Sequence, residues 1–252
     1  MNLLELTLPT PAENLACDEA LLDWCDTGDG PEVLRFWEPQ QHFVVVGFSN
    51  RVEREANVAA CRESGIPILR RCSGGGTVLQ GPGCLNYSLT LRIDSDPAFQ
   101  TVTGTNRFVM ERHRAALEKL LSGTRSFNFQ PSTFNSQLAV RGHTDLVLGD
   151  RKFSGNAQRR KRHAVLFHGS FLLDFDLALM EKALRLPSKQ PDYRAGRSHT
   201  EFLMNLSASA SEVEAALKQV WGAKDAWEGM SSEVISDLAV RKYATDAWNF
   251  RL

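Results

Sequence analysis

Cysteine is scarce in this sequence and never paired in a motif. The chain has 252 residues and five scattered cysteines, with no C-x-x-C pair: Cys17, Cys25, Cys61, Cys72 and Cys84. An odd, scattered set argues against a disulfide framework, and the lack of C-x-x-C pairs argues against structural zinc. A reducing compartment fits best, and we expect the protein in the cytoplasm.

Long apolar runs and a targeting segment are also lacking. Apolar runs such as Phe43–Val46 are far too short to cross a bilayer. Residues 1–6 show neither a basic region nor a long apolar stretch, so they do not resemble a secretory signal. We expect no membrane partner.

The chain has no excess of charge of either sign. Its 29 Lys and Arg and 30 Asp and Glu give a net charge of −1, so no overall field attracts nucleic acid. Only the segment from Arg151 to His163 is locally basic, with Arg151, Lys152 and the run at 159–163. That run is either a solvated hairpin tip or a docking surface for an acidic protein or a phosphate.

What is present is the pattern of an α/β protein. Thr10-Pro11-Ala12-Glu13 is a capping box with proline at the first helical position. Helices are predicted over 11–25, 53–64 and 105–122, and from Ser211; strands over 33–37, 43–47 and 68–71; and a strand meander over 138–176. No repeat or linker appears. We therefore expect a single α/β (α+β) domain over residues 1–252, with a mixed, largely antiparallel sheet packed by helices.

Two further segments have a clear pattern. Residues 85–94 alternate apolar and polar without exception, which predicts a strand with one buried face. Residues 187–197 are polar, basic and contain proline, which is typical of a mobile loop.

The run Arg70-Arg71-Cys72-Ser73-Gly74-Gly75-Gly76-Thr77-Val78 is the most informative in the chain. Three glycines allow a backbone that lies flush against a ligand, and free N–H groups beside guanidinium groups form an anion cradle. A tight turn would also explain the glycines. The two arginines favour the cradle, because guanidinium binds phosphate and carboxylate.

Three other residues are candidates for chemistry. Lys152 follows the turn pair Gly149-Asp150 and is either an exposed turn lysine or an ammonium held against the sheet, where it could stabilise an oxyanion or a phosphate. Cys84 follows Gly81-Pro82-Gly83 and is either a small buried residue or a thiol nucleophile assisted by Lys152. His168 precedes a glycine at a strand edge, and we interpret it as a structural hydrogen-bonding residue.

Several motifs, in order along the chain, resemble the lipoate–protein ligase family of the biotin and lipoate ligase superfamily. The resemblance covers about residues 14–250 and rests on NLACDEALL, VVVGFSN, RRCSGGGTV, GCLNYSL, DLVLGDRKFSGNAQRRKRHAVLFHGSFLLDFD and KYATDAWNF. It implies a catalytic domain that activates lipoate with ATP and Mg²⁺ as lipoyl-AMP, then transfers the lipoyl group to a carrier-domain lysine. The partners implied are the lipoyl domains of 2-oxoacid dehydrogenase E2 subunits and H-protein-like carriers.

The resemblance also assigns roles to residues. Lys152 would be catalytic, contacting both the acyl carbonyl and the phosphate. The ligands would be bound by Lys152 and by Arg71, Ser73, Gly74, Gly75, Gly76, Thr77, Val78, Leu79, Asn86 and Asp145. The lipoyl tail would occupy an apolar tunnel lined by the sheet and the first helix. Mg²⁺ would be held mainly by phosphate oxygens and water, so no side chain is assigned as a metal ligand.

The sequence departs from the family pattern at three places. Gln80-Gly81 stands where many ligases have His-Asp. The chain ends at Leu252, where other bacterial ligases continue, so we expect no accessory domain, and a separate accessory subunit or a preformed acyl-adenylate in its place. Cysteine-dependent octanoyltransferases have their nucleophile shortly before the strand that corresponds to DLVL, whereas residues 139–144 contain no cysteine and Gly142 and Asp145 form the ligase-type G-x-x-D.

The leading hypothesis is an ATP-dependent lipoate–protein ligase, or a lipoyl-AMP-dependent lipoyltransferase. The main alternative is an octanoyltransferase with a Cys84 thioester intermediate. A protein that only binds lipoate or lipoylated domains is a third hypothesis, which the combination of Arg71, three glycines and Lys152 disfavours. Biotin ligation ranks below these, because the glycine-rich loop differs from that of biotin ligases.

Overall fold

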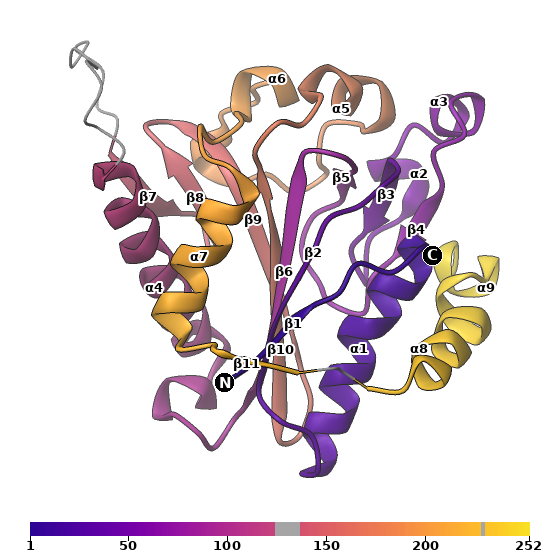
Figure 1. Cartoon of the computed structure of the whole chain (residues 1–252). Helices are drawn as coiled ribbons and strands as arrows, with labels where there is room; N and C mark the ends of the chain where they lie inside the picture. Colours follow the sequence, from indigo (N-terminus) through magenta and orange to yellow (C-terminus); the bar gives the residue numbers. More distant parts are fainter. Residues whose placement is uncertain (124–136, 228–229) are drawn as a thin grey trace.

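Two β-sheets and the helices around them make up the protein. The structure is a computed structural model that describes residues 1–123, 137–227 and 230–252. Within these residues, the larger sheet has eight strands and the smaller has three. Figure 1 shows the long strands β6, β9 and β10 at the centre, with the smaller sheet beside α1.

The larger sheet is mixed and largely antiparallel, as expected. Its order is β11-β1-β2-β6-β10-β9-β8-β7, and only the pairs β1–β11 and β1–β2 are parallel. The strands are β1 (Asn2–Glu5), β2 (Val33–Trp37), β6 (Cys84–Arg92), β7 (Leu138–Arg141), β8 (Asp145–Leu148), β9 (Arg151–Arg160), β10 (Ala164–Leu172) and β11 (Asp225–Ala226). The predicted meander over 138–176 is confirmed by β7 to β10.

The smaller sheet delivers the glycine-rich segment. Its central strand β3 (Phe43–Val46) pairs in parallel with β4 (Ile68–Arg70) and antiparallel with β5 (Val78–Gln80). The triple-glycine segment therefore connects the two outer strands of this sheet. Its two ends are fixed by pairing to β3.

Helices cover both faces of the larger sheet. Helices α4 (Val102–Gly123) and α7 (Ala210–Trp221) lie on one side, and α1 (Pro11–Thr27) lies on the other, with α8 (Ser232–Leu238) and α9 (Asp246–Asn249) beyond it (Figure 1). The remaining helices are short: α2 (Val52–Glu55), α3 (Val58–Glu63), α5 (Leu177–Ala183) and α6 (His199–Phe202). None of the helices in the described part of the chain is long and apolar enough to cross a membrane.

Helix α1 begins and ends as the sequence predicts. The Thr10 hydroxyl accepts from the Glu13 amide while the Glu13 carboxylate accepts from the Thr10 amide, and Gly28 closes the helix at φ = 96°. Its buried face packs against β6 and β10, and Leu22 and Cys25 lie in one cluster with Cys72, so α1 covers the sheet beside the glycine-rich loop.

Three local predictions are wrong, the first two because of tertiary contacts. The polar side of β6 is also buried, since Asn86, Ser88 and Thr90 lie under α1. The helix expected over 53–64 is interrupted at Ala56, which is extended and pairs with Leu184. Helix α7 begins two residues earlier than expected, because its capping box is formed by Ser209 and Glu212 instead of starting at Ser211.

Candidate active site

One extra residue in β9 sets the direction of Lys152. Leu146 pairs with Ser154, but the next residue, Val147, pairs with Lys152, so Phe153 has no partner on β8. Such a bulge re-aims the neighbouring side chains. The Lys152 side chain extends along β9 over Gly155, where an added Cβ would lie 2.6 Å from Nζ. Position 155 therefore has to be glycine for the amine to rest there.

A carboxylate holds this amine. Lys152 Nζ lies 2.7 Å from Asp145 Oδ1, and the two side chains are 22% and 15% exposed. Asp145 is the strand partner of Gly155 on β8, so the pairing of β8 with β9 fixes the ion pair. The two residues that the sequence singled out in this region are brought together.

The second oxygen of Asp145 is also occupied. The Tyr193 hydroxyl donates a hydrogen bond to Oδ2 at 2.7 Å. Burial, and then the charge of Asp145 and the hydrogen bond to it, raises the pKa of Tyr193 above its ordinary value. The phenol is therefore a stable donor at neutral pH.

The lysine and the triple-glycine loop border one stretch of β9. Ala157 lies two residues after Gly155, on the same face of the strand and about 7 Å along it. A Cβ added at Gly75 would lie 3.5 Å from the Ala157 Cβ. The Lys152 amine is thus at one end of this short face, and the loop is at the other.

Arg71 shapes the glycine loop from inside. Its guanidinium donates to the Ser73 hydroxyl at 3.0 Å, to the Gly74 carbonyl at 2.6 Å and to the Gly76 carbonyl at 2.7 Å. Arg71 is 8% exposed. Burial lowers its pKa to about 10, which leaves the guanidinium charged at neutral pH. Arg71 is therefore bound to the loop's own carbonyls in this structure.

The opposite side of the loop is open. A Cβ added at Gly74 or Gly76 would meet no atom within 4 Å. At Gly75 the backbone φ is 87°, in the left-handed region that favours glycine. Carbonyls gathered on the guanidinium and free space on the other side suit a loop that receives a ligand. The residues present are therefore compatible with an anionic group beside the loop.

A buried chain of polar groups holds Ser73. The Ser73 hydroxyl lies 2.6 Å from His168 Nε2, and His168 Nδ1 lies 3.2 Å from Asp18 Oδ2. Arg35 binds the other Asp18 oxygen at 2.7 Å. Burial alone would raise the pKa of Asp18, but the hydrogen bond with His168 and the charge of Arg35 outweigh it and lower the pKa. His168 therefore connects Ser73 to Asp18 through hydrogen bonds.

Arg70 ties the C-terminal segment to the same region. Its guanidinium binds the carbonyls of Gly47, Phe48 and Asn50 and also that of Asn249 in α9. Arg70 therefore has a structural role, which the pair of adjacent arginines did not reveal.

The other predicted ligand-binding residues are more scattered. Thr77 accepts from the Asn50 amide at 3.4 Å, and Val78 is half-buried in β5. The side chains of Leu79 and Asn86 are buried in the core, and Asn86 Nδ2 has no hydrogen-bond partner within the described ranges. Binding roles for these four residues stay predictions.

All five cysteines are buried. Cys84 has no exposed surface, and burial raises the pKa of its thiol to about 12. A thiol nucleophile must be accessible and ionised. The position of Cys84 therefore argues against a thioester at this residue.

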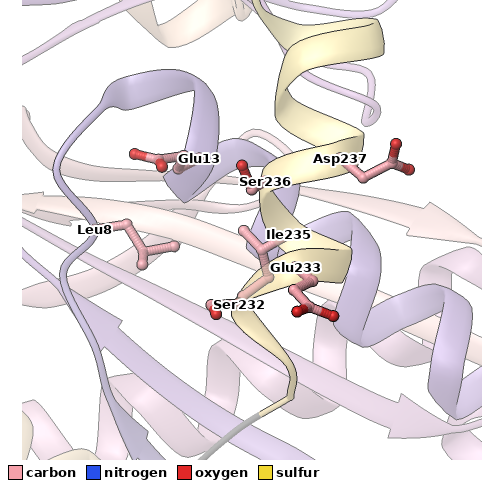
Figure 2. Close-up of a pocket in the computed structure, with 7 residues that line it drawn as sticks. All are labelled: Leu8, Glu13, Ser232, Glu233, Ile235, Ser236 and Asp237. Atoms are coloured by element: carbon pink, nitrogen blue, oxygen red, sulfur yellow. The ribbon is translucent and has the colours of Figure 1, made fainter.

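The tunnel for the acyl tail stays a prediction, and so does Mg²⁺ held mainly by phosphate oxygens and water. A surface hollow lies between Leu8, Glu13 and helix α8 (Figure 2), and Lys152 is not among the residues that line it. Across residues 1–123, 137–227 and 230–252, no group of three or more His, Cys, Asp or Glu side chains is arranged to hold a metal ion.

Sequence reasoning missed three residues of this region: Asp18, Arg35 and Tyr193. Arg35 stands inside the apolar strand Val33–Trp37, and Asp18 stands on the apolar side of α1. A cation inside an apolar strand, with a carboxylate on the apolar side of a helix, was an available signal for a buried ion pair. Tyr193 had no such signal, since it lies in a polar loop.

Comparison with known proteins identifies the family. The model of the lipoyl protein ligase A/B catalytic domain matches residues 10–220. The chain therefore belongs to this family of catalytic domains, as the motifs indicated, and it is an enzyme.

Two similar proteins have different activities in their names. Octanoyltransferase LipM of Geobacillus kaustophilus is 28% identical over 275 aligned residues, covering 96% of this chain and 94% of that protein. Lipoate-protein ligase A subunit 1 of Thermoplasma acidophilum is 27% identical over 262 residues, covering 98% of this chain and 96% of that protein.

Solved structures have the same fold. A lipoate-protein ligase A bound with ATP matches with a TM-score of 0.74 at 26% identity, over 99% of this chain and 98% of that chain. A T. acidophilum protein of the lipoate protein ligase type, with bound lipoic acid, matches with a TM-score of 0.78 at 24% identity, over 100% and 98%. The mixed α/β fold expected from the sequence is confirmed.

Proposed function

We propose that this enzyme transfers a lipoyl or octanoyl group from an acyl-adenylate to a lysine of a lipoyl carrier domain. The observation that carries the proposal is the Lys152 amine, held by Asp145 over Gly155 and on the face of β9 that leads to the glycine loop. A cation in a defined position on the strand that leads to an open glycine loop suits an acylated phosphate.

In the proposed transfer, the carrier lysine attacks the acyl carbonyl. The new C–N bond forms, the C–O bond to the phosphate breaks, and AMP leaves as the amine loses a proton. Negative charge develops on the carbonyl oxygen and on the leaving phosphate. One ammonium next to both oxygens stabilises the transition state more than the ground state, which is what accelerates the reaction.

The glycine loop would hold the nucleotide, and Arg71 would act by fixing the loop's shape. ATP-dependent activation is the earlier step of the same proposal, supported by the similar ligase that was solved with ATP. Mg²⁺ would accompany ATP and neutralise its phosphate charge, bound mainly through phosphate oxygens and water.

A second candidate is octanoyl transfer from an octanoyl carrier protein. The similar octanoyltransferase LipM of G. kaustophilus favours it. The burial of all five thiols favours a route without a cysteine intermediate. On that route Lys152 would have the same role at the carbonyl of a thioester donor.

The proposal includes partners, which the same comparisons support. One solved T. acidophilum system is a bi-partite lipoate protein ligase together with its E2 lipoyl domain. We propose a lipoyl domain as the acceptor of this enzyme and a separate accessory subunit for the ATP-dependent step. A cytoplasmic location belongs to the same proposal.

Mass spectrometry of a purified lipoyl domain tests the proposal. The domain is incubated with the enzyme and one donor at a time: lipoate with ATP and Mg²⁺, lipoyl-AMP, or octanoyl carrier protein. Modification of its lysine by lipoyl-AMP is the expected result. Modification by octanoyl carrier protein alone would favour the second candidate, and binding without modification by any donor would favour a lipoate-binding protein.

A further inference from the structure

The loop over residues 187–197, which the sequence indicates as mobile, places a tyrosine on the lysine–carboxylate pair. Asp192–Arg194 forms a single 3-10 turn after Pro191, and Ala195 and Gly196 follow with φ values of 52° and 73°. Two successive left-handed residues turn the chain sharply. Tyr193 lies in this turn and reaches Asp145 with its hydroxyl.

The backbone of Tyr193 is anchored to the turn between β8 and β9. Arg197 donates to the Tyr193 carbonyl at 3.0 Å and also binds the Asp150 carboxylate at 2.9 Å and the Asp150 carbonyl at 3.0 Å. One guanidinium thus joins the loop to the turn that precedes Lys152.

The ring of Tyr193 is packed as well. Its centroid lies 5.2 Å from that of Phe202, and the Arg141 guanidinium lies 5.7 Å from the ring centroid. The ring, the backbone and the hydroxyl each have a separate partner. The position of the hydroxyl is therefore fixed independently of Asp145.

We propose that Tyr193 is a positioning residue for Lys152. The hydroxyl binds Oδ2 and the amine binds Oδ1, so the phenol holds the Asp145 carboxylate in the orientation that directs Oδ1 to Lys152 over Gly155. The inference rests on the proposed function for its catalytic meaning, since the fixed amine is the one placed against the acyl phosphate.

A second tyrosine–carboxylate–lysine group provides a matched control. Tyr243 donates to Glu19 Oε2 at 2.8 Å, and Lys242 Nζ lies 2.8 Å and 2.6 Å from the two Glu19 oxygens. There the lysine binds both oxygens, so its position does not depend on the phenol. Tyr243→Phe removes the same chemical group at a site without a proposed role in transfer.

The test compares Tyr193→Phe with Tyr243→Phe. Acetylation of each lysine by acetic anhydride is followed by peptide mass spectrometry, which needs no enzymatic activity. In Tyr193→Phe, Asp145 is less well fixed, and we expect Lys152 to react about threefold faster or more, with Lys242 unchanged. With lipoyl-AMP and a lipoyl domain, we expect kcat to fall about tenfold and KM for the domain to change less than about twofold.

Each outcome decides the question. Unchanged Lys152 labelling in a folded Tyr193→Phe protein overturns the inference, and so does an equal loss of kcat in Tyr243→Phe. If Lys152 is labelled faster in Tyr193→Phe but the wild-type protein shows no acyl transfer, the positioning role is supported and the proposed function is contradicted. If Tyr193→Phe does not fold, Arg197→Gln, which releases the Tyr193 carbonyl, is expected to change the same readouts by a smaller factor.

Discussion

Two lysines of this protein have nearly the same surroundings by the usual measures. Lys152 and Lys242 each pair with a carboxylate that also accepts a tyrosine hydroxyl, and their side chains are 22% and 24% exposed. They differ in what else is near the amine. Lys242 binds both oxygens of Glu19, and its amine lies 4.0 Å from the centroid of the Trp248 ring.

Lys152 binds one oxygen and rests over a glycine. The Lys242 amine instead binds two carboxylate oxygens and lies against the Trp248 ring. Burial and ion pairing alone therefore do not single out a functional lysine. The number of partners that the amine already has is more informative.

The sharpest way to break this comparison is to remove each amine in turn. Lys152→Ala is expected to slow acyl transfer by two to three orders of magnitude, about 3–4 kcal/mol, because the oxyanion loses its cation. Lys242→Ala is expected to change the rate by less than about twofold. Single-turnover transfer from lipoyl-AMP, with circular dichroism as a folding control, measures both; equal rates in the two variants would remove the assigned role.

The loss of folding stability should be larger in Lys242→Ala than in Lys152→Ala, the opposite of the order for the transfer rate. Lys242→Ala leaves Glu19 partly buried without its cation and removes a contact with Trp248, so we expect a loss of about 1–2 kcal/mol in the free energy of unfolding. Lys152→Ala is expected to cost less than about 1 kcal/mol. Urea denaturation of both variants tests this, and a larger loss at Lys152 would mean that its ion pair is mainly structural.

Alkaline pH tests the three tyrosines. Burial, the largest cause at each of the three tyrosines, raises the pKa of Tyr87, Tyr193 and Tyr243. A raised folded-state pKa gives stability that is fully present below about pH 10 and is lost as the pH rises above that value. We expect phenolate absorbance to appear only together with loss of the circular dichroism signal, and Tyr243→Phe to reduce this alkaline destabilisation. Phenolate in a folded protein near pH 10 would contradict the buried positions.

The smallest effect is expected at Cys84. Cys84→Ala removes a buried sulfur, and acyl transfer should stay within about twofold of the wild-type rate with every donor. The same single-turnover assay with octanoyl carrier protein is the decisive arm. A loss of more than about a hundredfold in a folded variant would restore the thioester route.

Much of the fold could be predicted because its signals are local. The ends of α1 follow from Thr10, Glu13 and Gly28, and the meander β7–β10 follows from alternation and turn residues. Local signals failed where distant segments meet. Ala56 leaves the helix to pair with Leu184, and the polar face of β6 is buried because α1 covers it.

The candidate site shows the same limit. Lys152 and Asp145 could be named from motifs, and the structure joins them. The direction of Arg71 could not be predicted, because its partners are carbonyls of the loop that it precedes. Tyr193 lies 48 residues from Asp145 in the sequence, and no spacing rule connects them.

The unpaired Phe153 makes the chain length between Asp145 and Gly155 critical. With regular pairing and no bulge, Lys152 would lie opposite Leu148 instead of Val147, so that the amine would emerge on the side of the sheet packed by α4. A sequence alignment that places a one-residue gap at this point would therefore match the lysine of one protein to the wrong side of the sheet in another.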